Sequence, residues 1–391
     1  MKNLVVILIG LVLLSSCTKS VEKEIFSNSQ AVNQSSVKQT CNFGISQFNL
    51  AKHPFTYDGK RPTGGGSGGG GSIPPPANAS VILLDFDGQL VSGTSWNYAG
   101  DIICAPANLS ADAINLIINR VTNDYSPFNV VVTTDEAVFN ATSANRIRLI
   151  FTESWEWFGQ AGGTAMLNTF TVGSITPCFV FSSLLNYNIK NISEAAAHEV
   201  GHTIGLNHQS IYDAAGVKTS EYNYGQGTGE IAWAPIMGCG YNRNLSLWHK
   251  GPSSLSSTSI QDDVAVITAV LGNKADDYSN TISGAASLPS SLNGVINNPA
   301  DLDFFSINIG APATVTLTPF NVGVNHEGAD VDMVLRIYNS QGGLISTTNN
   351  GSTLNAVTLL APGTYFISAG CTSNPYATTY GMIGKYNISF N

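Results

Sequence analysis

The sequence predicts an α/β domain with a mixed sheet over residues 79–273, followed by an all-β sandwich over residues 276–391. The first domain is predicted because apolar, strand-like runs alternate with amphipathic segments that have a helical period. The second is predicted because short alternating runs of apolar and polar residues recur there between Gly, Asn and Pro turns. The chain has 391 residues, which is enough for two or three domains of ordinary size.

The α/β domain begins with an apolar strand, VILLDFDG at residues 81–88, which closes on a glycine turn. An amphipathic helix follows, with Ser110 as its N-cap and Pro127 just beyond its end. Further extended runs are FNVVVTTD, RIRLIFTE, GGTAMLNTFTVG and CFVFSS. This order of strands and helices predicts a twisted mixed sheet with crossover helices.

Two more helices complete the domain. In NISEAAAHEVGHTIG, Ser193 precedes a run of helix-forming residues, and Gly205 provides a stop. The segment SSTSIQDDVAVITAVLG predicts a second helix that ends at Gly272. We expect the domain to end there.

The N-terminal stretch MKNLVVILIGLVLLSSC has the features of a targeting segment. Lys2 precedes an apolar run from Leu4 to Leu14, which is too short to span a bilayer easily and suits a signal-peptide core. The ending LSSC resembles a bacterial lipoprotein signal, in which residues 1–16 are removed and Cys17 is lipidated. The alternative is an ordinary secretory signal with an incidental cysteine. The lipoprotein interpretation implies a chain anchored by lipid at the bacterial cell envelope and otherwise secreted.

Residues 17–78 are predicted to form a flexible tether or a short pro-segment. The part RPTGGGSGGGGSIPPP is rich in glycine and serine and ends in prolines, a composition that cannot build a packed core. The part CNFGISQFNLAKHPFTYDG is more apolar and could dock as a pro-segment. Cys41 could then bind a metal as a thiolate, although a lone cysteine in a linker usually has no such role.

The remaining cysteines would meet an oxidising environment after export. We expect two of Cys104, Cys178 and Cys239 to pair in a disulfide. With Cys17 assigned to lipid, an odd number of cysteines remains, so at least one thiol should stay free.

The composition excludes some classes of protein. Hydrophobic residues make up 43% and charged residues only 11%, so the chain can bury cores and is not a disordered acidic protein. The formal net charge of −9 argues against nucleic acid or an anionic membrane surface as the main partner, because both require basic patches.

Three of the six histidines lie in the stretch HEVGHTIGLNH. On a helix, His198 and His202 are one turn apart and project from the same face, so both imidazoles could bind one Zn²⁺. Gly205 can end the helix in a left-handed conformation and return the chain, which lets His208 supply a third nitrogen. The fourth position stays open for water, and Glu199 lies where it can reach that water without ligating the metal.

The alternative is an alanine-rich buried helix whose histidines are hydrogen-bonded core residues. A single histidine would favour that alternative. Three histidines at this spacing, together with the glutamate and the glycine, favour metal binding.

The same stretch matches the HExxHxxGxxH signature of the metzincin metallopeptidases at every fixed position, so this part of the chain resembles that family. The family has a methionine turn beneath the metal, for which Met237 in APIMGCGY is the matching residue. The resemblance covers roughly residues 79–273 and implies a metzincin-like α/β (α+β) catalytic domain. It also implies a peptide groove along one edge strand of the sheet. GGTAMLNTFTVG is the candidate for that edge, and a substrate would pair with it by β-augmentation.

Two positions depart from the patterns of this family. The residue after the third histidine often defines a subfamily, and Gln209 fits none of the large groups. Some members have a tyrosine two residues after the methionine, where this chain has Cys239. Tyr241 is nearby and is a candidate for support of the oxyanion.

The resemblance implies a zinc-dependent endopeptidase in which Glu199 takes the proton of the attacking water and passes it to the leaving amine. One alternative is a surface adhesion or glycan-binding protein built on a peptidase-like scaffold, and another is a zinc hydrolase of non-peptide amides. The intact ligand set and base favour the enzyme, because a binding scaffold has no chemical need for Glu199. The expected partners are a protein or peptide substrate and a membrane, reached through the N-terminal lipid, with no nucleic acid.

The C-terminal sandwich resembles a bacterial pre-peptidase C-terminal domain in its segments ADLDFFSINI and APGTYFISA. This resemblance implies an accessory module that is removed by processing or used for binding. Asp301, Asp303, Asp330 and Asp332 could contribute to a Ca²⁺ site. The alternative, which we favour from the sequence, is that they are solvent-facing residues of strands and turns.

Overall fold

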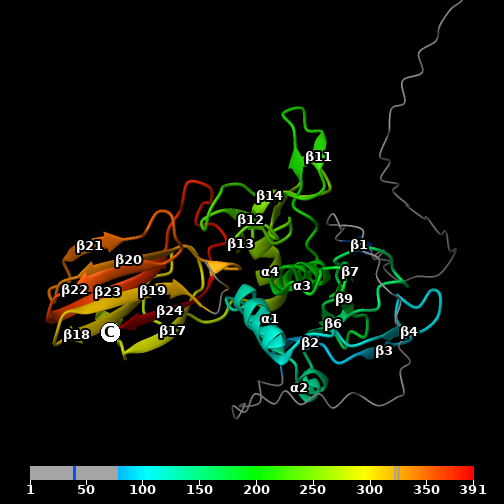
Figure 1. Cartoon of the computed structure of the whole chain (residues 1–391), viewed down its shortest axis with the longest axis horizontal. Helices are drawn as coiled ribbons and strands as arrows, with labels where there is room; N and C mark the ends of the chain where they lie inside the picture. The colour runs from blue at the N-terminus through cyan, green and yellow to red at the C-terminus, as the bar shows by residue number, and fades with distance from the viewer. Residues whose placement is uncertain (1–37, 41–77, 321–322, 324–325) are drawn as a thin grey trace, which may run out of the picture. The chain divides into compact units, whose positions relative to one another are not determined.

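The computed structural model describes residues 38–40, 78–320, 323 and 326–391 (Figure 1). The signal segment 1–16, the predicted lipidation site Cys17 and the cysteine at position 41 lie outside the described residues. Among the residues that are described, no helix has both the length and the apolar character needed to cross a bilayer.

The N-terminal domain contains a seven-stranded mixed sheet with the strand order β1-β7-β9-β6-β2-β5, and β8 pairs with β6. Strands β5, β2, β6 and β9 run parallel, whereas β7 is antiparallel to β9 and β1 is antiparallel to β7. The strands are β1 (Lys38–Thr40), β2 (Ser80–Asp85), β5 (Val130–Thr133), β6 (Asn145–Thr152), β7 (Gly163–Met166), β8 (Thr171–Val172) and β9 (Cys178–Phe181). The mixed α/β sheet predicted from the sequence is therefore confirmed.

Successive side chains of β2 face opposite sides of the sheet, as in any strand. Ile82 and Leu84 belong to the core that the sheet shares with three helices, α1 (Ala111–Asp124), α3 (Ile189–Ile204) and α4 (Asp263–Leu271). Val81 and Leu83 pack on the other side against Phe139 of the short helix α2 (Glu136–Ala141). That side is also covered by the strand pair β3 (Gln89–Val91) and β4 (Ile102–Cys104), which the sequence analysis did not predict.

Helix α3 begins earlier than its serine predicted. The N-cap is Asn188, whereas Ser193 lies within the helix and donates its hydroxyl to the carbonyl of Ile189 at 2.8 Å. The end of the helix is as predicted, because Gly205 takes a left-handed conformation with φ of 117°. The helix therefore carries His198 and His202 in its last two turns.

Between α3 and α4 the chain forms three small two-stranded sheets. Their strands are β10 (Ile211–Tyr212), β11 (Lys218–Ser220), β12 (Trp233–Pro235), β13 (Leu245–Leu247), β14 (Lys250–Pro252) and β15 (Ile260–Asp262). The β10–β11 hairpin projects from this region (Figure 1).

The predicted disulfide is wrong, since all four described cysteines are free, buried thiols. Cys104 and Cys178 lie in different apolar clusters on opposite faces of the sheet, and Cys239 lies in the loop after β12. Pairing requires two Cβ atoms about 4 Å apart, which a sheet between the two side chains prevents. Burial raises the pKa of Cys104 and of Cys239 to about 12, so both thiols are protonated at neutral pH.

The C-terminal domain is an all-β sandwich, as predicted. A five-stranded sheet has the order β16-β18-β23-β20-β21, and a four-stranded sheet has the order β17-β24-β19-β22. Apolar side chains of both sheets form one core. The strands are β16 (Ala286–Ser287), β17 (Ser291–Ile296), β18 (Asp303–Ile309), β19 (Ala313–Pro319), β20 (Met333–Tyr338), β21 (Leu344–Thr348), β22 (Ala356–Leu360), β23 (Gly363–Cys371) and β24 (Gly384–Phe390).

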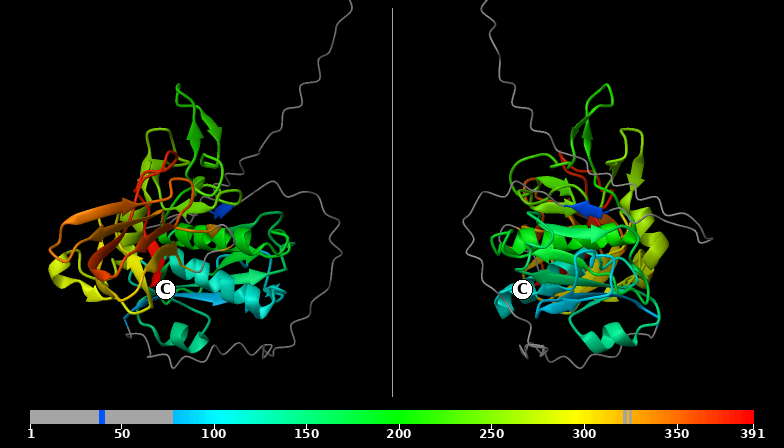
Figure 2. Two further views of the ribbon diagram at one scale, coloured as in Figure 1. Left: turned by 60° about the vertical axis from the view of Figure 1, so that its left-hand side comes forward. Right: turned by 90° about the vertical axis from the view of Figure 1, so that its right-hand side faces the viewer.

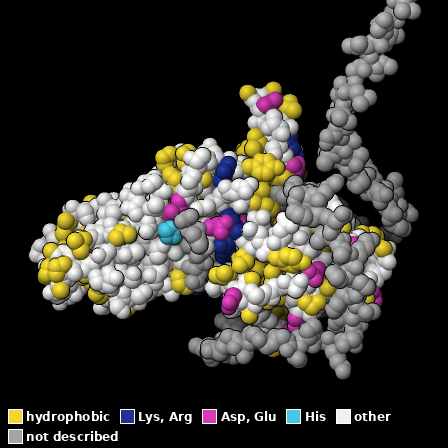
Figure 3. Space-filling view, viewed as in Figure 1, with side chains coloured by type: hydrophobic (Ala, Val, Ile, Leu, Met, Phe, Trp, Pro, Cys, Tyr) yellow, Lys and Arg dark blue, Asp and Glu magenta, His cyan; other side chains and the backbone are white. Residues whose placement is uncertain are grey.

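The two domains contribute to each other's cores. Ile383 from the sandwich belongs to the core of the α/β domain, and Trp233 and Leu245 belong to the core of the sandwich. Charged side chains are few on the face shown in Figure 3, in keeping with their share of 11% of the chain.

Candidate metal centre

The three histidines of the HEVGHTIGLNH stretch lie together. The ring centroids of His198 and His202, both on α3, are 4.6 Å apart. His208, which follows the turn at Gly205, has its ring centroid 5.2 Å from that of His198 and 4.8 Å from that of His202. One ring nitrogen from each histidine lies within 4.8 Å of the other two, which is close enough for small side-chain adjustments to bring all three to one ion.

Each imidazole is oriented by a hydrogen bond from its Nδ1. The acceptors are the carbonyl of Ile236 for His198, at 2.7 Å, and the carbonyl of Leu206 for His202, at 2.6 Å. His208 donates instead to the carboxylate of Glu221, at 2.8 Å. A proton on Nδ1 places the lone pair of each ring on Nε2.

The three Nε2 atoms are buried and have no hydrogen-bond partner within the protein. A buried polar atom without a partner costs about 1–3 kcal/mol, so a native protein rarely leaves three of them facing one another. A divalent cation would satisfy all three at once, and this donor set suits Zn²⁺. The residues present therefore fit the metal that the motif implies.

Burial keeps these imidazoles neutral. It lowers the pKa of His198 to about 3, with a further contribution from the neighbouring His208. Burial also lowers the pKa of His202 and of His208. Metal binding requires the neutral form, so the site is in the correct protonation state at neutral pH.

Glu199 is fully buried and lies against the first residue of β7. A Cβ on Gly163 would come within 2.7 Å of both Cγ and Oε1 of this glutamate. Only glycine fits at this position, because the strand backbone passes directly beside the carboxylate. The predicted general base and β7 are thus in contact, although β7 is not the edge strand that the sequence predicted, because β1 pairs with its outer side.

Met237 lies beneath the helix that carries the two histidines. It is fully buried, and a Cβ on Gly201 would come within 2.6 Å of its sulfur. The preceding residue, Ile236, provides the carbonyl that orients His198. The turn that contains Ile236 and Met237 therefore packs against α3 and orients one of the proposed ligands.

Two side chains at the centre have no counterpart in the sequence prediction, Glu221 and Tyr222. The ring centroid of Tyr222 is 4.5 Å from that of His208 and 6.4 Å from that of His198. Tyr241, the residue predicted to support the oxyanion, is partly buried and packs against the apolar core of the domain. No motif pointed to Glu221 or Tyr222, because they lie in a loop without a period.

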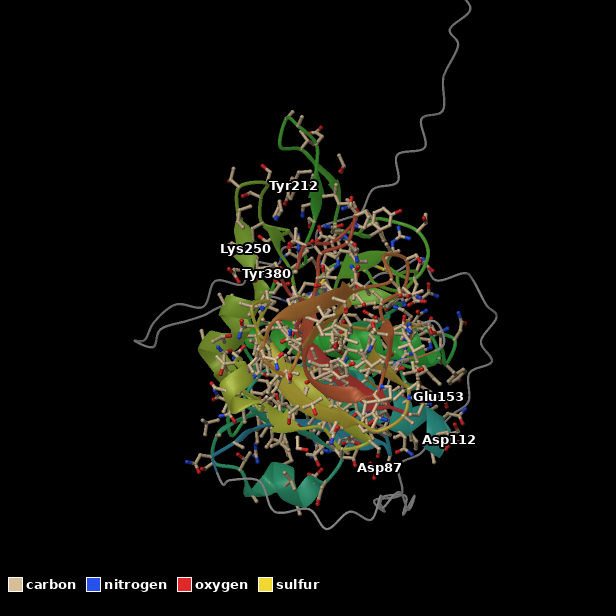
Figure 4. The ribbon with its side chains drawn as sticks, turned by 90° about the vertical axis from the view of Figure 1, so that its left-hand side faces the viewer. Asp87, Asp112, Glu153, Tyr212, Lys250 and Tyr380 are labelled. Carbon is tan, nitrogen blue, oxygen red and sulfur yellow. The ribbon has the colours of Figure 1, made fainter. Side chains whose placement is uncertain are left out.

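Glu221 also connects the β10–β11 hairpin to His208 through hydrogen bonds. Its second carboxylate oxygen accepts a hydrogen bond from the ammonium group of Lys218 at 2.7 Å, and Lys218 donates to the carbonyl of Ser254 at 2.7 Å. Tyr212, which is labelled in Figure 4, donates its hydroxyl to the carbonyl of Ser253 at 2.7 Å. The hairpin is thus held to the neighbouring loop beside the third histidine.

Gln209, at the position that departs from the family pattern, is a buried structural residue. Its backbone N–H donates to the carbonyl of Met237 at 2.7 Å, and its side-chain amide donates to Asp263 at 3.1 Å. Gln209 therefore joins the loop of the third histidine to the turn at Met237 and to α4.

The four aspartates of the sandwich do not form one site, and the expectation that they face solvent is wrong. All four are at least 97% buried. Asp301 and Asp303 lie together with Asp276, with one carboxylate oxygen of each within 4.8 Å of the others. Asp332 accepts a hydrogen bond from Asn374, and Asp330 lies elsewhere, at the contact with the α/β domain.

No family model and no curated protein matches the chain. Among solved structures, the pre-peptidase C-terminal domain of a collagenase from Bacillus anthracis is similar, with 13% identity and a TM-score of 0.20, over 30% of this chain and 99% of that domain. PliG from Aeromonas hydrophila, a periplasmic inhibitor of g-type lysozyme, has 15% identity and a TM-score of 0.18, over 29% of this chain and 93% of its own. Both TM-scores are low, so neither similarity assigns a function to the chain.

Proposed function

We propose that this protein is a zinc-dependent endopeptidase of the metzincin type, with His198, His202 and His208 as the zinc ligands. One observation carries the proposal: three buried Nε2 atoms without partners face one another, and each ring is oriented through its Nδ1. A histidine cluster in an ordinary core would have its nitrogens paired with protein groups.

The chain's own residues account for the remaining requirements of peptide hydrolysis. When bound, the zinc ion supplies Lewis-acid polarisation of the substrate carbonyl and increases the acidity of water. The carboxylate of Glu199 accepts the proton of the attacking water and delivers it to the leaving nitrogen. The backbone of β7, which passes beside this carboxylate at Gly163, aligns an extended peptide by strand pairing.

The variant Glu199→Gln tests the proposal. It keeps the three ligands, so we expect about one zinc per chain by elemental analysis, as in the parent. We expect its rate of hydrolysis of a denatured protein substrate to fall by about 10²- to 10⁴-fold, the usual contribution of a general base. The exposed Glu156→Gln is the matched control and should hydrolyse at the parental rate.

Three other outcomes would count against the proposal. A purified, folded chain without zinc would remove its basis. Full hydrolysis by Glu199→Gln would contradict the role of the base. Zinc binding without chelator-sensitive hydrolysis of any protein would favour the adhesion or glycan-binding alternative.

We infer two accompanying properties. Cys17 anchors the mature chain to the bacterial envelope by a lipid. Incorporation of a labelled fatty acid into the parent, but not into the variant Cys17→Ser, would test this property.

The cluster of Asp276, Asp301 and Asp303 is the candidate Ca²⁺ site of the sandwich. Thermal unfolding with and without added calcium would test the second property.

A further inference from the structure

A cavity of about 240 Å³ lies on the side of the large sheet that is opposite to α3 and its histidines. Its walls come from β3, α2, β6 and the loop between β8 and β9. Figures 1 and 2 show α3 above the sheet and α2 below it, so the sheet separates this cavity from the candidate metal centre. The proposed function makes no use of the cavity.

One charged side chain in the cavity wall, Arg146 of β6, has no acidic partner. Its Nη1 donates to the carbonyl of Phe139 at 2.7 Å, and its guanidinium lies over the ring of Phe139, 4.5 Å from the centroid. Its buried Nε has no hydrogen-bond partner, and the side chain forms no ion pair with any residue that the structure describes. A positive charge that is partly withdrawn from water is costly without an anion beside it. The guanidinium is therefore fixed in place and lacks a counter-ion.

The neighbouring Arg148 also lines the cavity, but its charge is already compensated. Its two terminal nitrogens form ion pairs with Asp85 and Glu136. These carboxylates limit what the cavity can accept, because they would repel a dianion such as phosphate. A single carboxylate needs only the one free guanidinium, and its shape matches that group.

Much of the remaining wall is apolar. Val91 and Ile150 are buried in it, whereas Leu90 and Ile175 remain 39% and 68% exposed. Apolar walls around one oriented polar group are typical of sites for small molecules. Sites for drug-sized ligands have volumes of about 300–1,000 Å³, so this smaller cavity suits a group of the size of one amino-acid residue.

We propose that this cavity binds a small carboxylate that carries an apolar group, with the carboxylate on Arg146 and the apolar group against the wall around Ile150. Two sources share this chemistry: a free carboxylic acid, and the C-terminal residue of a peptide that ends in an apolar side chain. The site requires neither zinc nor hydrolysis, so the inference does not depend on the proposed function.

The first test is a titration of the full chain with N-acetylleucine, followed by saturation-transfer NMR. We expect saturable binding with a dissociation constant on the order of 1 mM, as for a ligand of about a dozen heavy atoms. N-acetylleucinamide has nearly the same shape but no charge, and it should bind at least about tenfold more weakly. Equal binding of the two compounds, or no saturable binding of the acid, overturns the inference.

The variant Arg146→Gln tests the location of the site. We expect it to bind N-acetylleucine at least about tenfold more weakly than the parent, because the charged donor is lost. The matched control is Arg243→Gln, which removes the same charge from the loop between β12 and β13 and should keep the parental affinity. Equal affinities of the two variants overturn the inference.

A second variant covers the case in which Arg146→Gln does not fold. Ile175 is exposed, so Ile175→Asp should leave the fold intact and place a negative charge beside the cavity. We expect it to bind N-acetylleucine at least about fivefold more weakly than the parent, because like charges repel. Leu344→Asp, at a similarly exposed position of the sandwich, is its control. Parental affinity in Ile175→Asp overturns the inference.

Two further probes identify the class of ligand. If N-acetyl-glycylglycylleucine binds at least as tightly as N-acetylleucine, the inference is supported and the ligand is the C-terminal end of a peptide. Weaker binding of this tripeptide than of N-acetylleucine supports the inference with a free acid as the ligand. Inorganic phosphate should not displace N-acetylleucine at equal concentration, and displacement by phosphate would overturn the assignment of the cavity to a carboxylate.

Discussion

At the candidate metal centre, the three histidines are oriented by two kinds of partner. His198 and His202 donate to backbone carbonyls, which no side-chain substitution removes. His208 donates to the carboxylate of Glu221, which is a side chain. A charged acceptor behind an imidazole fixes its orientation and increases its basicity as a ligand. Of the three proposed ligands, His208 is therefore the one whose strength as a ligand a single side-chain substitution can change.

We predict that Glu221→Gln lowers zinc affinity by about 10- to 100-fold, the usual effect of losing a carboxylate behind a histidine ligand. The amide oxygen can still accept the hydrogen bond from Nδ1, but the negative charge is gone. Zinc affinity is measured by competition with a chromophoric chelator. Glu156→Gln, on an exposed loop, should keep the parental affinity. Equal affinities for the two variants would show that Glu221 has no influence on the ligand.

Among the elements, α3 and the turn that contains Met237 approach each other closely at the site. The helix has a glycine, Gly201, where the sulfur of Met237 approaches, and any side chain there would overlap it. Glycine in the middle of a helix costs about 1 kcal/mol relative to alanine. Packing offsets this cost. Because residue 201 has no side chain, the turn that contains Met237 can pack directly against α3, and the carbonyl of Ile236 in that turn can reach His198.

We predict that Gly201→Ala lowers the free energy of unfolding by about 1–3 kcal/mol, the usual cost of an additional methyl group in a packed core. Helix propensity alone would predict the opposite sign. Chemical denaturation of the metal-free protein measures the difference. The control is Gly310→Ala, where the added Cβ meets no atom within 4 Å. A more stable Gly201→Ala protein would mean that the turn lies farther from the helix.

For the whole molecule, the contact between the two domains contains buried acidic side chains. Asp124 is the last residue of α1, and Asp330 precedes β20 in the sandwich. Burial, and then the charge of Asp124, raise the pKa of Asp330 well above its usual range. Burial and the charge of Glu194 do the same for Asp124. The domain contact is therefore expected to be strongest when these carboxyl groups are protonated.

We predict that Asp330→Asn becomes more stable than the parent as the pH rises from 5 to 8. The raised pKa means that the folded parent binds more protons than the unfolded chain above about pH 4, so its stability falls with rising pH. Asparagine does not titrate, and the stability difference should grow by at most about 1.4 kcal/mol per pH unit. Thermal unfolding at both pH values tests this. The variant Asp101→Asn, at an exposed position, is the control and should show no such trend. If the stability difference between Asp330→Asn and the parent were equal at both pH values, the prediction would be contradicted.

Predictions that depended on neighbouring residues held better than those that depended on distant ones. The N-cap at Ser110, the stops at Gly205 and Gly272, and the shared face of His198 and His202 were all correct, because caps and helix periodicity are local properties. The predicted helix start at Ser193 was wrong because Asn188, an equally good capping residue, lies five residues earlier.

The sequence by itself determined the type of each domain and the proposed ligand set, because strand alternation and the spacing of one helix and one glycine turn are encoded by adjacent residues. Only the tertiary structure decided which distant groups meet. It brought Glu221 to His208 and Gly163 to Glu199, placed β1 on β7, separated the cysteines on two faces of a sheet, and buried the aspartates. Such contacts depend on the order of the strands in the sheet and on the packing of loops that have no hydrophobic periodicity. Strand order and loop packing cannot be inferred from the local sequence of the segments that meet.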